Sequence, residues 1–166
     1  MTAELYAALA SLDSAGRTDF PDVYAGLEID ERRGMAIVYR VPSAAFDDHV
    51  RRTAGGLPVE LRDAVHPLAS LTALQERITA DLRLWAARGV RINTVGARHD
   101  GSGVEVGTED VAAALRGLPG RYGADAPIIV VEQGPVVPLP AADAPGPRPA
   151  RGPADRRPTD SRPTDR

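Results

Sequence analysis

Hydrophobic and polar positions alternate in two separate stretches of the chain, and each stretch has a turn at its centre. The first covers 24–41. The second covers 91–107 and turns from His99 to Gly103, where glycine can adopt a positive φ. A period of two is typical of strands, and turn residues between two such runs are typical of a β-hairpin. The sequence therefore predicts two hairpins. In the first, the alternating apolar residues are Leu27, Ile29, Ile37 and Tyr39.

Each predicted hairpin is followed by a short helix and then by another strand. After the first hairpin comes a helix with Phe46 and Val50 on one face, followed by a strand over 59–65. After the second comes a helix that Thr108 is expected to cap, followed by an apolar strand over 128–131. We therefore expect an α+β fold in which two hairpin–helix–strand units form a mainly antiparallel sheet packed against helices.

Two further stretches have the period of an amphipathic helix. Residues 2–14 carry leucines at helical spacing, and 71–88 carries a longer apolar stripe that ends before Gly89. Trp85 lies on this longer stripe, so packing in the core explains it better than stacking on a base or a sugar. The whole stripe consists of Leu71, Leu74, Ile78, Leu82 and Trp85.

A change of composition near residue 134 sets the expected domain boundaries. Residues 134–166 hold nine of the fifteen prolines and no aromatic residue. Such a segment buries too little apolar surface to offset the entropy of ordering it. We expect an N-terminal helix and linker over 1–20, an α+β domain with both repeated units over 21–133, and a disordered tail rich in Pro, Arg and Asp over 134–166.

The charge of the chain excludes two classes of partner. The net charge is −3; six arginines and four aspartates give 134–166 a charge of +2, which leaves −5 for 1–133. An acidic domain is a poor electrostatic match for nucleic acid or for an anionic membrane surface. All basic residues are arginine. Together with the abundant Ala, Gly, Pro and Asp, this bias indicates a GC-rich genome more than a selection for phosphate contacts.

Cysteine content and the N-terminal sequence bear on the compartment. The chain has no cysteine, so neither disulfides nor thiolate chemistry are expected. The first residues lack the basic start and the apolar run of a signal peptide, and no stretch approaches the length of a transmembrane helix. We expect a cytoplasmic protein, or a secreted one if the true start lies upstream.

No set of residues has the spacing of a known catalytic or metal-binding motif. The histidines stand apart in the sequence at His49, His66 and His99, so ordinary surface roles explain them better than metal ligation. Ser43 and Thr108 stand just before predicted helices, where capping explains them better than nucleophilic attack. We therefore predict no catalytic, cofactor-binding or metal-binding residues, and no cofactor.

One acidic pair keeps an enzymatic alternative open. Glu28 and Asp30 lie two apart on a predicted strand, so their carboxylates share a face. A dispersed acid–base site would use Glu28, Asp30 or His99, near the ends of the hairpins.

Several short runs carry a resemblance to a known family. They are Tyr24–Asp30, Gly89–Gly96, Gly103–Gly107, Arg121–Gly123 and Val130–Glu132. These runs resemble the pro-regions of actinobacterial alpha-lytic-protease-like serine proteases, which have the chymotrypsin fold, and also related stand-alone secreted proteins. The resemblance covers about 24–133. It implies a small sheet packed under helices that lies against a protease and acts as a folding chaperone and inhibitor. It implies no catalytic residues.

Three functions remain open at this point. The first is a non-enzymatic, prodomain-like protein-binding module that acts in trans, because only the Pro/Arg/Asp tail stands where a protease would begin. A sheet edge would add a strand from an extended protein segment, a protease or a second copy of the chain. Arg40–Val41 and Val106–Gly107 end their strands without obvious gatekeeper residues. The alternatives are a structural or regulatory accessory protein tethered by its tail, and the dispersed enzyme described above.

Overall fold

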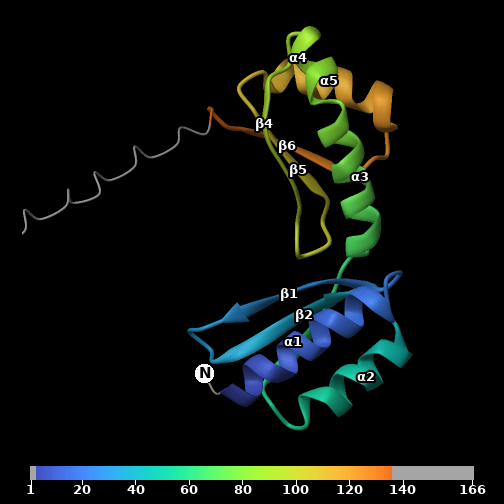
Figure 1. Ribbon diagram of the computed structural model, residues 1–166, viewed down its shortest axis with the longest axis vertical. Coiled ribbons are helices and arrows are strands. Elements are labelled where there is room, and N and C mark those ends of the chain that lie inside the picture. Colours follow the sequence, from blue (N-terminus) through green and yellow to red (C-terminus); the bar gives the residue numbers. More distant parts are fainter. Residues whose placement is uncertain (1–2, 136–166) are drawn as a thin grey trace, which may run out of the picture. The chain divides into compact units, whose positions relative to one another are not determined.

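The computed structural model describes residues 3–135, and these residues fold as two copies of one unit (Figure 1). The predicted disordered tail lies outside the described residues, except for Gly134 and Pro135. In chain order the elements are α1 (Ala3–Thr18), β1 (Tyr24–Asp30), β2 (Met35–Arg40), α2 (Ala44–Ala54), β3 (Val59–Asp63), α3 (Leu68–Ala80), α4 (Leu82–Ala87), β4 (Ile92–Ala97), β5 (Val104–Thr108), α5 (Val111–Tyr122) and β6 (Ile128–Glu132).

The α+β class is confirmed, and each unit forms a sheet of its own. The strand orders are β1-β2-β3 and β4-β5-β6. In each sheet the hairpin is antiparallel, whereas the third strand runs parallel to the second. A helix connects the second strand to the third, and a crossover of this kind returns the chain in the same direction. The chain therefore contains two mixed sheets of three strands, where the sequence had suggested one mainly antiparallel sheet.

The two units match in their details as well as in their order. Both hairpins have a bulge near the start of the first strand, at Tyr24–Gly26 and at Ile92–Thr94. Each third strand is joined to the second by equivalent backbone hydrogen bonds at both ends. At the start they run from Ala36 N to Pro58 O and from Val104 N to Pro127 O; at the end they run from Ala64 N to Arg40 O and from Gln133 N to Thr108 O.

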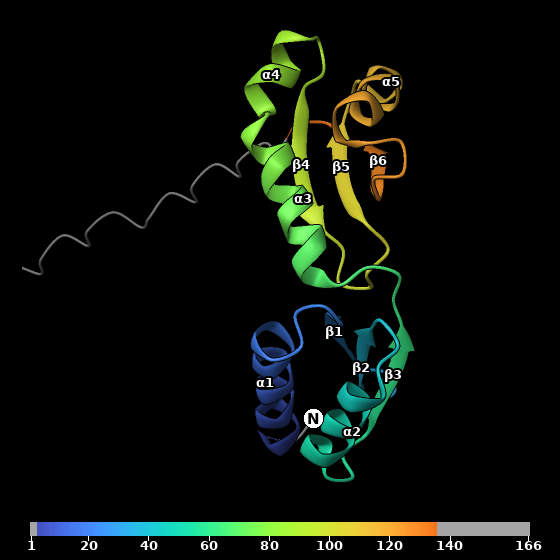
Figure 2. The same ribbon diagram turned by 90° about the vertical axis from the view of Figure 1, so that its right-hand side faces the viewer.

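Each unit also has a separate hydrophobic core, covered by helices on one face of its sheet (Figure 2). Helix α1 supplies its predicted leucines to the first core and so packs as part of the first unit. The first core contains Leu5, Leu9, Leu12, Tyr24, Ala36, Val38, Phe46 and Val50. The second contains Leu71, Leu74, Ile78, Trp85, Val90, Val104, Val106, Ala114 and Leu118.

The apolar stripe predicted over 71–88 belongs to two helices, because the helix is interrupted at Asp81. Asp81 has φ −94° and ψ 6°, and its carboxylate accepts hydrogen bonds from Arg121 (2.5 and 2.7 Å) and from the Tyr122 hydroxyl (2.8 Å). These bonds, with the Arg121 bonds as the larger cause, lower the pKa of Asp81 to about 2. Trp85 Nε1 donates to the Tyr122 oxygen at 2.9 Å. The junction of α3 and α4 is thus attached to the end of α5.

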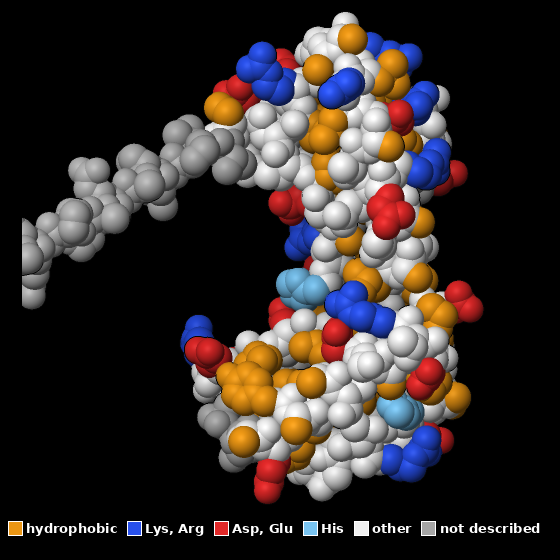
Figure 3. Space-filling model, in the orientation of Figure 1, with side chains coloured by type: hydrophobic (Ala, Val, Ile, Leu, Met, Phe, Trp, Pro, Cys, Tyr) orange, Lys and Arg blue, Asp and Glu red, His pale blue; other side chains and the backbone are white. Residues whose placement is uncertain are grey.

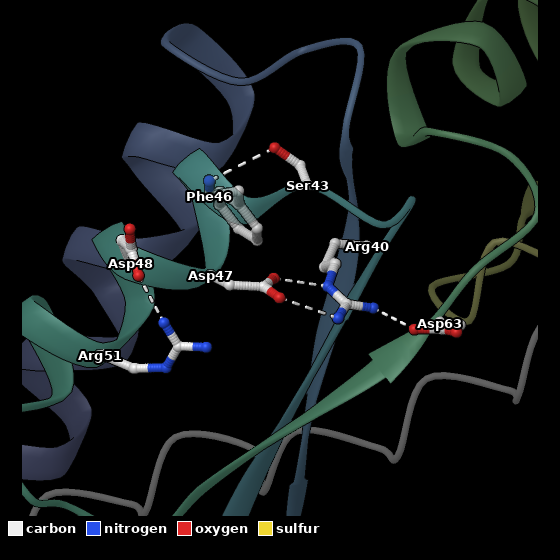
Figure 4. Close-up of polar contacts among 7 residues, drawn as sticks. All are labelled: Arg40, Ser43, Phe46, Asp47, Asp48, Arg51 and Asp63. Atoms are coloured by element: carbon white, nitrogen blue, oxygen red, sulfur yellow. Dashed lines mark hydrogen bonds and ion pairs between the residues drawn. The ribbon is translucent and has the colours of Figure 1, made fainter.

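A buried arginine joins three elements of the first unit (Figure 4). The Arg40 side chain is only 11% exposed, and its Nε and Nη2 donate to the two Asp47 oxygens at 2.7 and 3.1 Å. Its Nη1 donates to Asp63 at the end of β3. Ser43 Oγ accepts from Phe46 N at 3.4 Å, which confirms the expected N-cap of α2. Because Arg40 donates to it, the Asp47 carboxyl has a pKa below its usual value.

The second unit has Thr108 where the first has Arg40. The Thr108 hydroxyl donates to Arg91 O at 2.6 Å and accepts from Asp110 N at 3.0 Å. Because α5 begins only at Val111, with Asp110 as its N-cap, the prediction that Thr108 caps this helix is wrong. Instead Thr108 satisfies backbone groups at the end of β5.

Gln133 fixes the point at which the chain leaves the second sheet. Its backbone oxygen accepts from Asn93 Nδ2 at 2.7 Å, and its side-chain Oε1 accepts from Thr94 Oγ1 at 2.6 Å. The Gln133 side chain lies over Gly107, where any Cβ would collide with it and with Thr94. The chain beyond β6 therefore starts from a defined place beside the last strand.

Candidate functional site

The structure brings together two of the three residues considered for a dispersed polar site. His99 Nε2 lies 2.8 Å from Glu28 Oε2, and the Tyr39 hydroxyl donates to Glu28 Oε1 at 2.9 Å. The rings of Tyr39 and His99 meet edge to face with centroids 5.8 Å apart. Asp30 is not part of this cluster, because its carboxylate accepts from Arg33 N within the turn of the first hairpin.

The tip of the second hairpin lies against the first sheet at this cluster. Gly101 O accepts from His66 N at 3.1 Å, and Gly101 has a φ of 70°. A Cβ at Gly101 would collide with Ala64, and a Cβ at Gly26 would collide with the backbone of His99. The glycines that the hairpin pattern assigned to a turn therefore also allow two backbones to approach closely.

Glu28 is the centre of the Glu28–Tyr39–His99 cluster. Both of its oxygens have a partner, and hydrogen bonds from His99 first and Tyr39 second lower the pKa of the Glu28 carboxyl. The ionised carboxylate therefore accepts hydrogen bonds that join the first sheet to the tip of the second hairpin.

The His99→Leu substitution is expected to raise the pKa of Glu28 toward its ordinary value, because it removes the largest cause of the lowering. A carboxyl whose folded-state pKa is lowered stabilises the fold above its unfolded pKa of about 4.3 and loses that effect as the pH falls through the folded value. Carboxyl ¹³C NMR titration measures the change, with Tyr39→Phe as the variant that should move it less. An unchanged Glu28 titration in His99→Leu would contradict the contact.

The two other histidines lie apart from this cluster. His49 lies on α2 beside the rings of Phe20 and Phe46. His66 follows β3 and contributes its backbone N–H to the hairpin contact. Among residues 3–135, no group of three or more His, Asp or Glu side chains is placed to hold a metal ion.

A second candidate site is the free edge of β6. Strands β3 and β6 occupy the same place in their sheets, yet their outward-facing side chains differ. On β3 these are Glu60 and Arg62, which form an ion pair at 2.7 Å. At the matching positions β6 has Ile129 and Val131. Charged side chains protect an edge against pairing with other chains, so β3 is protected in a way that β6 is not.

Alternate residues of β6 turn their backbone N–H and C=O toward this edge. Val104 N donates to Pro127 O, and Gln133 N donates to Thr108 O. These two bonds show which residues of β6 turn their backbone groups toward β5. In a parallel pair every second residue bonds to the neighbouring strand. The backbone groups left for the free edge are therefore those of Val130 and Glu132 and the carbonyl of Ile128, because Ile128 N already donates to Ala126 O at 2.7 Å.

The strand ends singled out from the sequence are not at this edge. Arg40 and Val106 belong to β2 and β5, which are the central strands of their sheets and have neighbours on both sides. The sequence analysis placed the edges within the hairpins because it could not show that each third strand adds beside the second. The usable signal for β6 was its unbroken aliphatic run, which contrasts with the charged strand over 59–63.

No known protein family matches this chain. No curated protein matches it either. The resemblance to protease pro-regions therefore remains a prediction from the short runs quoted above. None of the helices between residues 3 and 135 is both long enough and apolar enough to cross a membrane. On the face shown in Figure 3, arginines are scattered among acidic side chains.

Proposed function

We propose that this protein is a non-enzymatic binding module whose β6 edge pairs with an extended segment of a protein partner. The contrast between β3 and β6 carries the proposal. Strands β3 and β6 hold the same position in the two units. Charged side chains protect β3 against pairing with another chain, whereas β6 has aliphatic side chains at the matching positions. An edge with free backbone groups and aliphatic side chains favours the addition of a strand from another chain.

The net charge of the domain indicates which charge the partner segment should carry. Residues 1–133 carry a net charge of −5, so two copies of this domain repel each other, whereas a basic segment is attracted. Glu132, at the end of β6, is exposed and adds a local negative charge. The proposed partner segment is therefore extended, aliphatic at alternate positions and basic at its ends.

The resemblance to pro-regions supplies the first partner class to test. A chymotrypsin-fold serine protease, bound in trans, fits a module that covers part of another protein with its sheet. Inhibition of such a protease by the full chain is the readout, and lack of inhibition together with strong peptide binding would favour a partner of another class.

A Val130→Pro substitution is expected to weaken partner binding at least about tenfold, while the domain still folds with a lower stability because the Val130 side chain packs against the second core. Proline removes a backbone N–H that faces the free edge, and edge positions tolerate this loss. Linear peptides are first selected from a displayed random library on the full chain, and their Kd is then measured for the parent and the variant. Circular dichroism reports the fold.

Leu61→Pro is the matched control, because Leu61 on β3 is the position equivalent to Val130 on β6. We expect Leu61→Pro to leave the peptide Kd unchanged. Equal binding by the parent and Val130→Pro would contradict the edge proposal. Sedimentation of the full chain as a dimer that Val130→Pro dissociates would show that the edge pairs with a second copy instead.

A further inference from the structure

An apolar cavity lies between α5 and the inner side of β6. Its volume is about 100 Å³, and no polar side chain lines it, so the polar atoms in its wall belong to the backbone. Leu115 and Pro119 line it from the helix, and Ile128 and Val130 line it from the strand. A dry apolar cavity of about 150 Å³ accepts a benzene molecule, so a somewhat smaller one fits a single aliphatic side chain.

The cavity faces the free edge of β6. Ala114 and Leu118 are the buried residues of α5 and form its inward-facing stripe. On one flank of this stripe, Gly117 lies against the ring of Trp85. At about 100° per residue, Leu115 lies on the opposite flank. Its exposed fraction of 57% agrees with this position. Figure 2 shows α3 and α4 on the side of β4, and α5 on the side of β6.

A strand added beside β6 would reach this cavity without any change of the fold. Side chains of neighbouring strands that point to the same face lie about 5 Å apart. A residue of the added strand that points to the same face as Ile128 and Val130 therefore lies under the Leu115 flank of α5. A charged side chain would find no ionisable partner among the lining side chains, and a bulky one would exceed the volume.

We propose that this cavity selects the partner segment by one aliphatic side chain of the size of Val, Ile or Leu. The inference rests on the proposed pairing with β6 and adds a specificity pocket to it. The backbone of the added strand supplies affinity that does not depend on sequence, and the cavity supplies the preference.

A series of synthetic peptides tests the pocket. The host is Arg-Thr-Thr-Thr-X-Thr-Thr-Thr-Arg, in which X is Ala, Val, Leu, Phe or Asp. The host has β-forming polar residues, basic ends and one variable side chain. We expect a Kd for X = Leu at least about tenfold lower than for X = Ala, since each buried methylene group contributes about fourfold. Kd is measured on the full chain from the amide NMR shifts of β6.

The Leu115→Ala variant provides the matched test of size. Removing this exposed wall widens the pocket, so we expect X = Phe to gain at least about threefold over X = Leu. Because Leu115 is mostly exposed, the fold should remain, and a thermal unfolding curve checks this. Equal Kd for X = Ala and X = Leu, with binding still lost in Val130→Pro, would overturn the pocket and leave the edge pairing standing. Peptide binding that is as strong in Val130→Pro as in the parent, or no binding of the X = Leu peptide, would overturn both the pocket and the edge pairing.

Discussion

Replacement of Trp85 by alanine is expected to lower the free energy of unfolding by about 3–5 kcal/mol. The Trp85 side chain is 1% exposed in the second core, and its indole donates to Tyr122, which in turn donates to Asp81. The substitution leaves a large cavity and removes the donor of a buried hydrogen bond. Because the two cores are separate, the loss should be concentrated in the second unit.

Hydrogen exchange shows which elements lose stability in Trp85→Ala. Amides of β4, β5 and α5 should lose more protection in Trp85→Ala than amides of β1, β2 and α2. Tyr6→Ala is the control, because Tyr6 is a largely exposed aromatic residue and its removal should change stability by no more than about 0.5 kcal/mol. A uniform loss of protection across both units would mean that they unfold as one cooperative body.

The substitution Asp47→Ala is expected to lower the free energy of unfolding by about 2–4 kcal/mol. It leaves the Arg40 guanidinium in place with its main partner gone, and the side chains of Arg40 and Asp47 are only 11% and 17% exposed. Breaking a buried ion pair by removing one partner typically costs about 3–5 kcal/mol, and the slight exposure reduces this value. Urea denaturation measures the change.

Asp63→Ala is the matched control for the same arginine. The Asp63 side chain is 77% exposed, so its loss should cost less than about 1 kcal/mol. A larger effect of Asp63→Ala than of Asp47→Ala would contradict the assignment of the buried pair.

Acid denaturation should test the Arg40–Asp47 pair in a second way. The pKa of Asp47 is lowered in the fold, so its stabilising effect is present above the unfolded value of about 3.9 and is lost as the pH falls through the folded value. The parent protein should therefore lose more stability between about pH 5 and pH 2 than Asp47→Ala does. Equal acid profiles would show that the Arg40 pair does not carry this dependence.

The sequence predicted local structure better than it predicted pairing between strands. Both hairpins and the core position of Trp85 are confirmed, because alternation and helical periodicity are local signals. The interruption at Asp81 escaped the analysis, since the apolar stripe continues through it and the cause lies with Arg121, forty residues away. On β2 the residues that belong to the first core are Ala36 and Val38, whereas Ile37 and Tyr39 lie on the other face of the sheet, where Ile37 is also buried.

The candidate sites show the same contrast between local signals, which the sequence reveals, and long-range contacts, which it does not. Glu28 and His99 were singled out one by one, but only the fold shows that they meet, because they stand 71 positions apart in the chain. The β6 edge could not be located, since the sequence does not reveal that each third strand adds beside the second. What made the edge recognisable afterwards was the internal repeat, which provides β3 as a reference for β6.

The anchoring of Gln133 has a practical consequence for protein engineering. Because Asn93 and Thr94 hold this residue at the end of β6, anything joined to the chain after Pro135 starts close to the edge proposed for binding. A candidate partner segment fused there through a short flexible linker would have an effective concentration in the millimolar range. Segments too weak for titration could thus be ranked by the stability that they add to a single fused chain.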